Sequence, residues 1–117
     1  MSGATSRRRG HQFERAIAQY LRDNGWQAIT SRQAEGGRQE GADIITDFPV
    51  SVEAKSAKTL DLSGWLRQAK DAAAGDPACV FVKRRGVGDV GRCYVVFEAD
   101  DLLLLVASLV GEGDVAA

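Results

Sequence analysis

Glu53 and Lys55, near the middle of the chain, have types and a spacing that could support chemistry on a phosphate ester. Positions i and i+2 of a strand share a face, so a strand here would project a carboxylate and an ammonium group to one place. Asp43 lies ten residues upstream of Glu53, and Glu14 lies in an earlier helical segment. Phosphodiester hydrolysis needs a metal that neutralises the phosphate, an oriented water and a cationic group. Carboxylates bind Mg²⁺ and a lysine can orient or deprotonate water, so these four residues predict a metal-dependent nuclease site.

The Glu53-Ala54-Lys55 pattern is common by itself, and it is also typical of an ion pair on a solvated strand face. Four surrounding features favour the nuclease interpretation: an upstream Gly-Ala-Asp entering an Ile-Ile strand, a hairpin before the Glu-Ala-Lys strand, a following helix with Gln68, and a preceding helix with Glu14. Gln68 could point at the site or could be an ordinary exposed polar residue. The backbone carbonyl of Ala54 would offer the metal a further oxygen ligand.

The composition limits the kind of metal site. His11 is the only histidine, which argues against a Ser-His-Asp triad and against a His-rich metal site. Two cysteines, Cys79 and Cys93, are too few for a zinc quartet, and both lie in apolar runs typical of core packing. Oxygen ligands therefore predict Mg²⁺, with Mn²⁺ able to substitute.

The elements that must position these residues alternate between helix and strand. Residues 10–24 have helical periodicity and end at Asn24-Gly25. The other predicted elements are strands over 26–31, 42–46 and 50–56, a helix over 62–74, strands over 78–83 and 92–98, and a helix over 100–110. This order predicts an α/β fold with a mixed central sheet flanked by helices. Residues 10–110 would be a single domain, with a flexible basic arm over 1–9 and a disordered tail over 111–117.

Charge is distributed unevenly along the 117 residues. All 15 Lys and Arg residues lie at or before Arg92, where the net charge is +4, whereas the rest of the chain carries five acids and no base. A basic body is what a phosphate backbone requires. We find no secretory signal and no apolar run long enough to span a membrane, so we expect a cytoplasmic protein.

Asp43 and Glu53-x-Lys55 resemble the two motifs of the PD-(D/E)XK nuclease superfamily, although Ala42 stands where its first motif often has Pro. Within it, the chain most resembles the archaeal-type Holliday junction resolvases over about residues 10–97. The further segments that carry this resemblance are Gly10-x-x-Phe13-Glu14-Arg15, Ser31-Arg32, Trp65 to Ala74, and Val80 to Lys83. The chain departs from the family in a longer loop over 33–41 and an added apolar helix over 100–110.

The resemblance implies a restriction-endonuclease-like fold and a homodimer that nicks two strands symmetrically across a four-way junction. It also implies that Arg15, Arg32 and Lys83 contact DNA. The products would carry 5′-phosphate and 3′-hydroxyl ends.

Further basic residues could bind phosphate or could simply be solvated charge, and the sequence leaves both interpretations open. Arg32 and Arg38 flank the Gly-rich loop, which could cover substrate. The other candidates are Arg7, Arg8, Arg9, Arg84 and Arg85. Leu102 to Leu105 is too apolar to be solvated all round, so it is predicted to pack on the core or on a second subunit.

The sequence therefore predicts a homodimeric, Mg²⁺-dependent endonuclease that prefers four-way junctions. Asp43, Glu53, Glu14 and the Ala54 carbonyl would hold the metal, and Lys55 would orient the water. Two alternatives remain. One is a restriction- or repair-type nuclease on duplex or flapped DNA, and the other is a non-catalytic DNA-binding module of the same fold.

Overall fold

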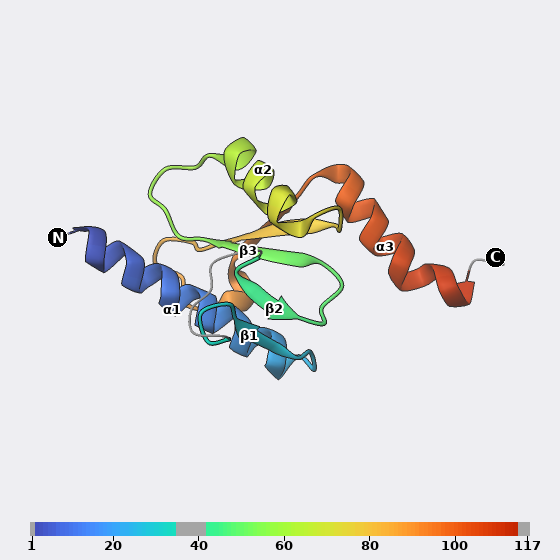
Figure 1. Cartoon of the computed structure of the whole chain (residues 1–117), viewed down its shortest axis with the longest axis horizontal. Coiled ribbons are helices and arrows are strands. Elements are labelled where there is room, and N and C mark those ends of the chain that lie inside the picture. The colour runs from blue at the N-terminus through green and yellow to red at the C-terminus, as the bar shows by residue number, and fades with distance from the viewer. Residues whose placement is uncertain (1, 35–41, 115–117) are drawn as a thin grey trace.

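Helices and strands alternate along the chain in the computed structural model, which describes residues 2–34 and 42–114, without the side chains of 2–6 and 112–114. The helices and strands follow one another in the predicted order, and most strands are shorter than the predicted ranges (Figure 1). The elements are α1 (Ser2–Asp23), β1 (Ala28–Thr30), β2 (Ile44–Thr46), β3 (Ser51–Lys55), α2 (Leu62–Ala73), β4 (Ala78–Val82), the 3₁₀ turn η1 (Val90–Arg92), β5 (Tyr94–Phe97) and α3 (Ala99–Asp114).

Helix α1 begins at Ser2, eight residues before the predicted start. The segment predicted as a flexible arm, residues 1–9, is therefore helical from Ser2 on, and this helical part includes Arg7, Arg8 and Arg9. Once the C-terminal half of the helix is held by packing, each added residue contributes one more hydrogen bond, and arginine is a good helix former. The helix ends as predicted, because Gly25 adopts a φ of 96° and the Trp26 amide donates to the Leu21 carbonyl at 3.0 Å.

The five strands form a mixed sheet and a separate hairpin. Strand β3 pairs in parallel with β4, and β4 pairs antiparallel with β5, so the predicted mixed sheet is confirmed. Strands β1 and β2 form a two-stranded antiparallel sheet of their own. The expected hairpin ladder between β2 and β3, all of whose residues are described, is absent, because residues 47–50 turn the chain without pairing the two strands.

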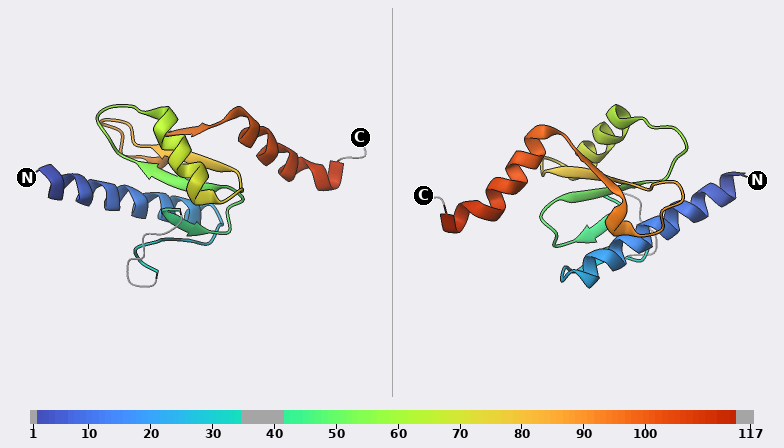
Figure 2. Two further views of the ribbon diagram at one scale, coloured as in Figure 1. Left: turned by 45° about the horizontal axis from the view of Figure 1, so that its top comes forward. Right: turned by 180° about the vertical axis from the view of Figure 1, so that it is seen from behind.

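Helices α1 and α2 cover opposite faces of the mixed sheet (Figure 2). One core cluster joins Phe13 and Ile17 of α1 to Val52 and Phe81 of the sheet. The other joins α2 to the opposite face, with Trp65 and Ala69 against Val80 and Val82. Cys79 is fully buried in the first cluster and Cys93 packs against it, which confirms the core assignment of both. Glu53 and Lys55 belong to the face that α2 covers, since they alternate with Val52 and Ala54 along β3.

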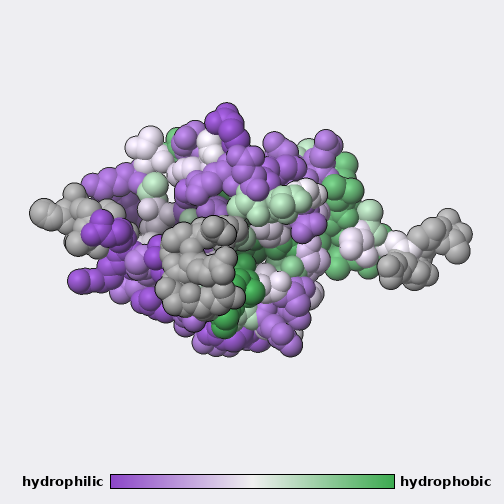
Figure 3. All heavy atoms as spheres, in the orientation of Figure 1, coloured by the Kyte–Doolittle hydropathy of each residue, from purple (hydrophilic) through white to green (hydrophobic). Residues whose placement is uncertain are grey.

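Helix α3 extends away from the rest of the molecule (Figures 1 and 2). Asp101 fixes its first turn by accepting hydrogen bonds from Lys70 of α2 and from the Ala78 amide of β4. Among the described side chains of this helix, only Leu105 packs against the core, and hydrophobic surface gathers at this end of the molecule (Figure 3). No helix among the described residues is long and apolar enough to cross a membrane.

Candidate active site

Strand β3 and helix α2 together position Glu53, Lys55 and Gln68. The Gln68 amide nitrogen donates to Glu53 Oε2 at 3.1 Å, and its amide oxygen accepts from Lys55 Nζ at 2.7 Å. One amide therefore bridges the Glu53 carboxyl group and the Lys55 ammonium group. The structure brings all three predicted residues together at the C-terminal half of β3.

Asp43 reaches the same site from the residue just before β2. Its backbone carbonyl accepts from the Ser31 amide at 2.9 Å, which ties it to the end of β1. Its Oδ2 atom accepts from the Ala54 amide at 2.9 Å, which ties it to β3 between Glu53 and Lys55. This side-chain hydrogen bond holds Asp43 beside β3, although β2 and β3 do not pair as strands.

Glu14 approaches from α1 and is half-buried. Burial raises the pKa of the Glu14 carboxyl, and the negative charge of Asp43 raises it further. Arg32 opposes this shift, because its Nε lies 3.4 Å from Glu14 Oε1, and Arg15 opposes it as well. Glu14 is thus close enough to Asp43 for their charges to interact.

Glu53 is the acid with the least favourable electrostatic environment. Only 4% of the residue is exposed, and among the described residues its Oε1 atom has no hydrogen-bond partner. The pKa of Glu53 is raised to about 8, mainly by burial and then by Asp43 and Glu14, against an opposing effect of Lys55. An unpartnered buried carboxylate oxygen beside two more acids is a site where a cation would relieve the repulsion.

The ligand chemistry of this cluster fits a hard divalent cation. No group of three or more His, Cys, Asp or Glu side chains in residues 2–34 and 42–114 converges closely enough to hold a metal by itself. Mg²⁺ does not require such a cage, because it keeps several waters and is bound through one or two carboxylates together with substrate phosphates. Asp43 and the unpartnered Oε1 of Glu53 meet that requirement.

The comparison with protein families agrees with this geometry. A model of the archaeal Holliday junction resolvase (hjc) family matches residues 5–63, about half of the chain. The chain belongs to that family. No curated protein and no solved structure gave a significant match.

Membership in the Holliday junction resolvase family makes the protein a nuclease of the restriction-endonuclease-like fold. The matched residues include Glu14, Asp43, Glu53 and Lys55. Gln68 and the strands β4 and β5 lie beyond the matched part, so only the tertiary contacts of Gln68 associate it with the candidate site.

The candidate DNA-binding residues of this resolvase-family chain fall into two groups. Arg15 is exposed on α1, and Arg32 lies beside Glu14 at the end of β1. Arg7, Arg8 and Arg9 are exposed on the first half of α1. Arg38 lies outside the described residues.

The second group follows β4. The Lys83 amide donates to the Lys55 carbonyl at 2.9 Å, while Lys83 Nζ donates to the Val87 carbonyl at 3.1 Å. Arg84 donates to the Arg92 carbonyl at 3.0 Å, and Arg85 is exposed. Lys83 and Arg84 are thus held by backbone carbonyls at the same end of the sheet as Lys55.

Two residues of interest escaped the sequence interpretation. His11, which in the sequence only argues against other kinds of site, lies close to several arginines. Burial lowers the pKa of its imidazole, and the charges of Arg32, Arg15 and Arg7 lower it further. Its position one turn before Glu14 on the same helix was the available signal. Tyr94 lies in the segment predicted as a strand over 92–98, and no local sequence pattern marks it as a functional residue.

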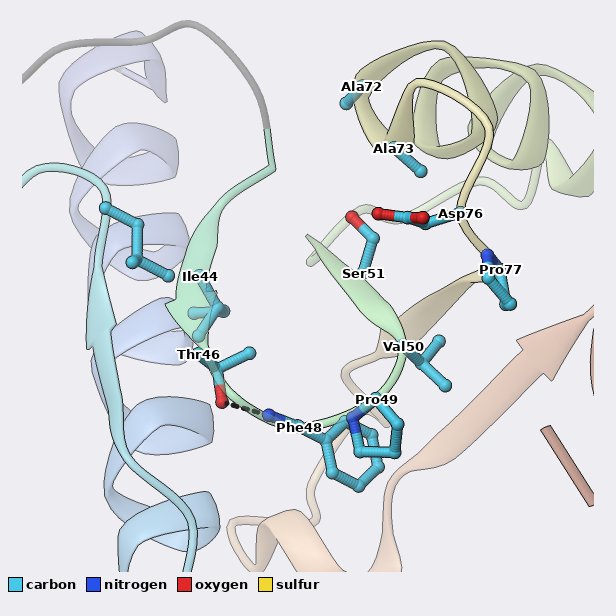
Figure 4. Close-up of a pocket in the computed structure, with 11 residues that line it drawn as sticks. Ile44, Thr46, Phe48, Pro49, Val50, Ser51, Ala72, Ala73, Asp76 and Pro77 are labelled. Carbon is cyan, nitrogen blue, oxygen red and sulfur yellow. Dashed lines mark hydrogen bonds between the residues drawn. The ribbon is translucent and has the colours of Figure 1, made fainter. Parts of the chain in front are cut away.

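A cavity of about 450 Å³ lies elsewhere, between the turn after β2 and the C-terminal end of α2. Figure 4 shows Ser51 and Asp76 turned toward each other beside the apolar side chains of Phe48, Pro49 and Val50. It borders the N-terminal end of β3, away from Lys55, and Asp76 is the only charged residue among the described ones that line it. The described part of its lining holds no Lys or Arg and only one carboxylate, so it lacks the paired carboxylates and the lysine that meet at the C-terminal end of β3.

Proposed function

We propose that this resolvase-family chain is a divalent-metal-dependent endonuclease that nicks four-way DNA junctions symmetrically as a homodimer in the cytoplasm. The observation that carries the proposal is the convergence of Asp43, Glu53, Lys55 and Gln68, whose groups are linked through hydrogen bonds to one amide side chain and to the backbone of β3. Family membership supports the junction as substrate.

The chain's own residues have separate tasks in this mechanism. Asp43 and Glu53 would hold Mg²⁺, or Mn²⁺ in its place, with Glu14 and the Ala54 carbonyl as further oxygen donors. When bound, the cation would neutralise charge on the phosphate and make a water more acidic. Lys55 would orient the attacking water and stabilise the charge that develops on the phosphate. Gln68 keeps the Lys55 ammonium in place by accepting its hydrogen bond.

The homodimer is supported by the surface of α3. Six of its apolar residues are exposed: Leu102, Leu103, Leu104, Val106, Leu109 and Val110. The helix carries no Lys or Arg, which disfavours DNA as the molecule that covers it. A second copy presents the same apolar surface and would supply the second active site that paired nicks on a two-fold substrate require.

A cleavage assay tests the proposal. A synthetic four-way junction, a flap and a matched duplex are incubated with the protein and either Mg²⁺ or EDTA, and the products are resolved on a denaturing gel. Paired symmetric nicks in the junction, lost with EDTA, support the proposal. Equal cutting of all three substrates would keep a nuclease but remove the junction preference. DNA binding without cleavage in Mg²⁺ or Mn²⁺ would favour the non-catalytic module.

The matched variants are Asp43→Asn and Glu53→Gln, which keep the side-chain shape and remove the negative charge. Each is expected to lower cleavage by more than about a hundredfold, because even the outer partners of metal ligands contribute about 10–100-fold. Folding should persist, since the amide side chain of the Asp43→Asn variant would still offer an oxygen to the Ala54 backbone amide. Full cleavage by either variant would rule out the proposed metal site.

A further inference from the structure

An exposed aromatic ring with a cation held against it lies on the edge strand β5. The Arg84 guanidinium lies 4.5 Å from the centroid of the Tyr94 ring. Arg84 is itself fixed, because it donates to the Arg92 carbonyl at 3.0 Å. Tyr94 is nevertheless 60% exposed, so most of its surface remains free for a ligand. Arginine on one side of the ring restricts its motion and prepares it for stacking.

The register of the sheet places this ring beside the proposed nuclease site. Lys55 pairs with Val82, and Val82 pairs with Tyr94, so the three residues form one row across the sheet. Residues directly opposite each other on paired strands share a face, which puts Tyr94 on the face that carries Glu53 and Lys55. Strands lie about 4.8 Å apart, so the backbones of Lys55 and Tyr94 are about 10 Å apart.

The chemistry around the ring indicates what it would bind. Arg85, which follows Arg84, and Arg92, two residues before Tyr94, are both exposed, and a surface rich in arginine favours a phosphate-bearing ligand over an apolar protein partner. An exposed aromatic ring in such a basic environment is how proteins bind nucleobases that are not paired, because every base has a flat face. Bases inside a continuous duplex are already stacked on both sides and cannot use it.

We propose that Tyr94 and Arg84 form a stacking platform for an unpaired or unstacked base at the branch point of the DNA substrate. The inference rests on the proposed function, and it adds a means of distinguishing branched DNA from duplex. Tyr94 stacks on the base, and Arg84 supports the ring and neutralises the adjoining phosphate. Base opening at the branch would then occur about two strands away from the proposed metal site.

The test measures binding in EDTA, so that it does not depend on cleavage. Four-way junction DNA with 2-aminopurine at the branch point and the corresponding duplex are titrated with wild type and variants. Stacking quenches 2-aminopurine fluorescence, and anisotropy gives the affinity. Tyr94→Ala is expected to abolish the quenching and to weaken junction binding by about tenfold, within the range measured for single base–aromatic stacks. Its duplex affinity should change by less than about twofold.

Tyr94→Phe and Val95→Ala are the matched controls. Phenylalanine keeps the ring, so quenching and junction affinity should stay near wild type. Val95 is 41% exposed but lies on the other face of β5, so its loss should change neither. Circular dichroism and thermal unfolding check that each variant is folded.

The outcomes separate this inference from the proposed function. If wild type binds the junction and quenches the probe, but Tyr94→Ala does so equally, the stacking platform is refuted while the nuclease proposal stands. A loss as large in Tyr94→Phe as in Tyr94→Ala would also refute it, because the ring would then not be what binds. If wild type binds junction and duplex equally without quenching, the junction preference itself fails.

Discussion

Buried carboxylates without full hydrogen bonding are rare in folded proteins, and Glu53 is one of them. Its Oε2 atom accepts from Gln68, and its Oε1 atom has no partner within the described residues. Asp43, by contrast, accepts from the Ala54 amide through its Oδ2 atom, and its backbone carbonyl accepts from the Ser31 amide. The site thus combines one fixed acid with one acid that needs a proton or a cation, and this difference makes Glu53 the better probe of metal binding.

The stability of the metal-free protein should depend on pH through Glu53. Its folded pKa is about 8, above the usual 4.5, so between these values the folded protein keeps a proton that the unfolded chain has released. Stability therefore falls as pH rises through this interval. In EDTA, the midpoint of thermal unfolding should drop by several degrees between about pH 5.5 and about pH 8.5, and Glu53→Gln should lose most of that drop.

Adding Mg²⁺ at the higher pH should raise the midpoint of wild type, because a ligand that binds only the folded state stabilises it. The same Mg²⁺ should have little effect on Glu53→Gln. An equal pH-dependent drop in wild type and variant would show that Glu53 does not have the raised pKa.

Gln68 should act as a positioning residue. Gln68→Ala removes the acceptor of Lys55 Nζ and the donor to Glu53 Oε2, and we expect cleavage to fall by about 10–100-fold with little change in stability. The pH–rate profile should also shift, because the ammonium and the carboxylate lose their common partner. Asp71→Ala, exposed on the same helix, is the control. A merely structural role would lower stability and leave the profile unchanged.

The carboxylate of Asp101, on α3, forms hydrogen bonds to both α2 and the sheet. Asp101 is 3% exposed and accepts from Lys70 Nζ at 2.9 and 3.0 Å and from the Ala78 amide at 3.1 Å. Burial alone would raise the pKa of Asp101, but these hydrogen bonds and the Lys70 charge outweigh it and lower the pKa. Because Lys70 is two residues from Gln68, this contact also helps to hold the helix that carries Gln68.

Asp101→Ala should destabilise the protein by about 1–3 kcal/mol, since it leaves the buried Ala78 amide without an acceptor. Urea unfolding followed by circular dichroism measures the change. Asp100→Ala, exposed on the same turn, should cost much less. Equal effects of the two substitutions would mean that the buried hydrogen bonds contribute little.

The molecule is elongated, and its two ends differ in chemical character. Its longest dimension is 57 Å, against 29 and 27 Å for the others, with the basic start of α1 at one end and α3 at the other (Figure 1). The sequence left open whether Leu102 to Leu105 packs on the core or on a second subunit. The structure buries Leu105 in part and leaves Leu102, Leu103 and Leu104 exposed, so the core accounts for only one of the four.

Disrupting this surface should separate the proposed dimer. Leu103 and Leu109 are each 65% exposed, and the double variant Leu103→Glu/Leu109→Glu should be monomeric by light scattering after gel filtration. Paired nicking should fall with it, while the fold persists. Leu60→Glu, at a 66% exposed position between β3 and α2, is the control and should leave the dimer intact. A wild-type monomer at all concentrations would contradict the prediction.

Local sequence patterns were enough to predict the order of helices and strands and the candidate acids Asp43 and Glu53. The periodicity of residues 10–24, the alternation of β3 and the Gly25 stop depend on neighbours within a few positions, and the structure confirms each of them. The resemblance carried by Asp43 and Glu53-x-Lys55 also gave the family that the comparison found. The roles of the individual residues stay predictions.

Only the tertiary structure decided which distant side chains meet. The bridge made by Gln68 spans 13 and 15 residues of sequence, and the row from Lys55 to Tyr94 crosses two strand pairings. The separate β1–β2 sheet and the partial burial of Leu105 likewise depend on packing between elements. Hydrogen bonds and charges act over a few ångströms in space, whatever the separation along the chain. The sequence therefore determined the chemical groups and their local elements, and folding determined which of them act together.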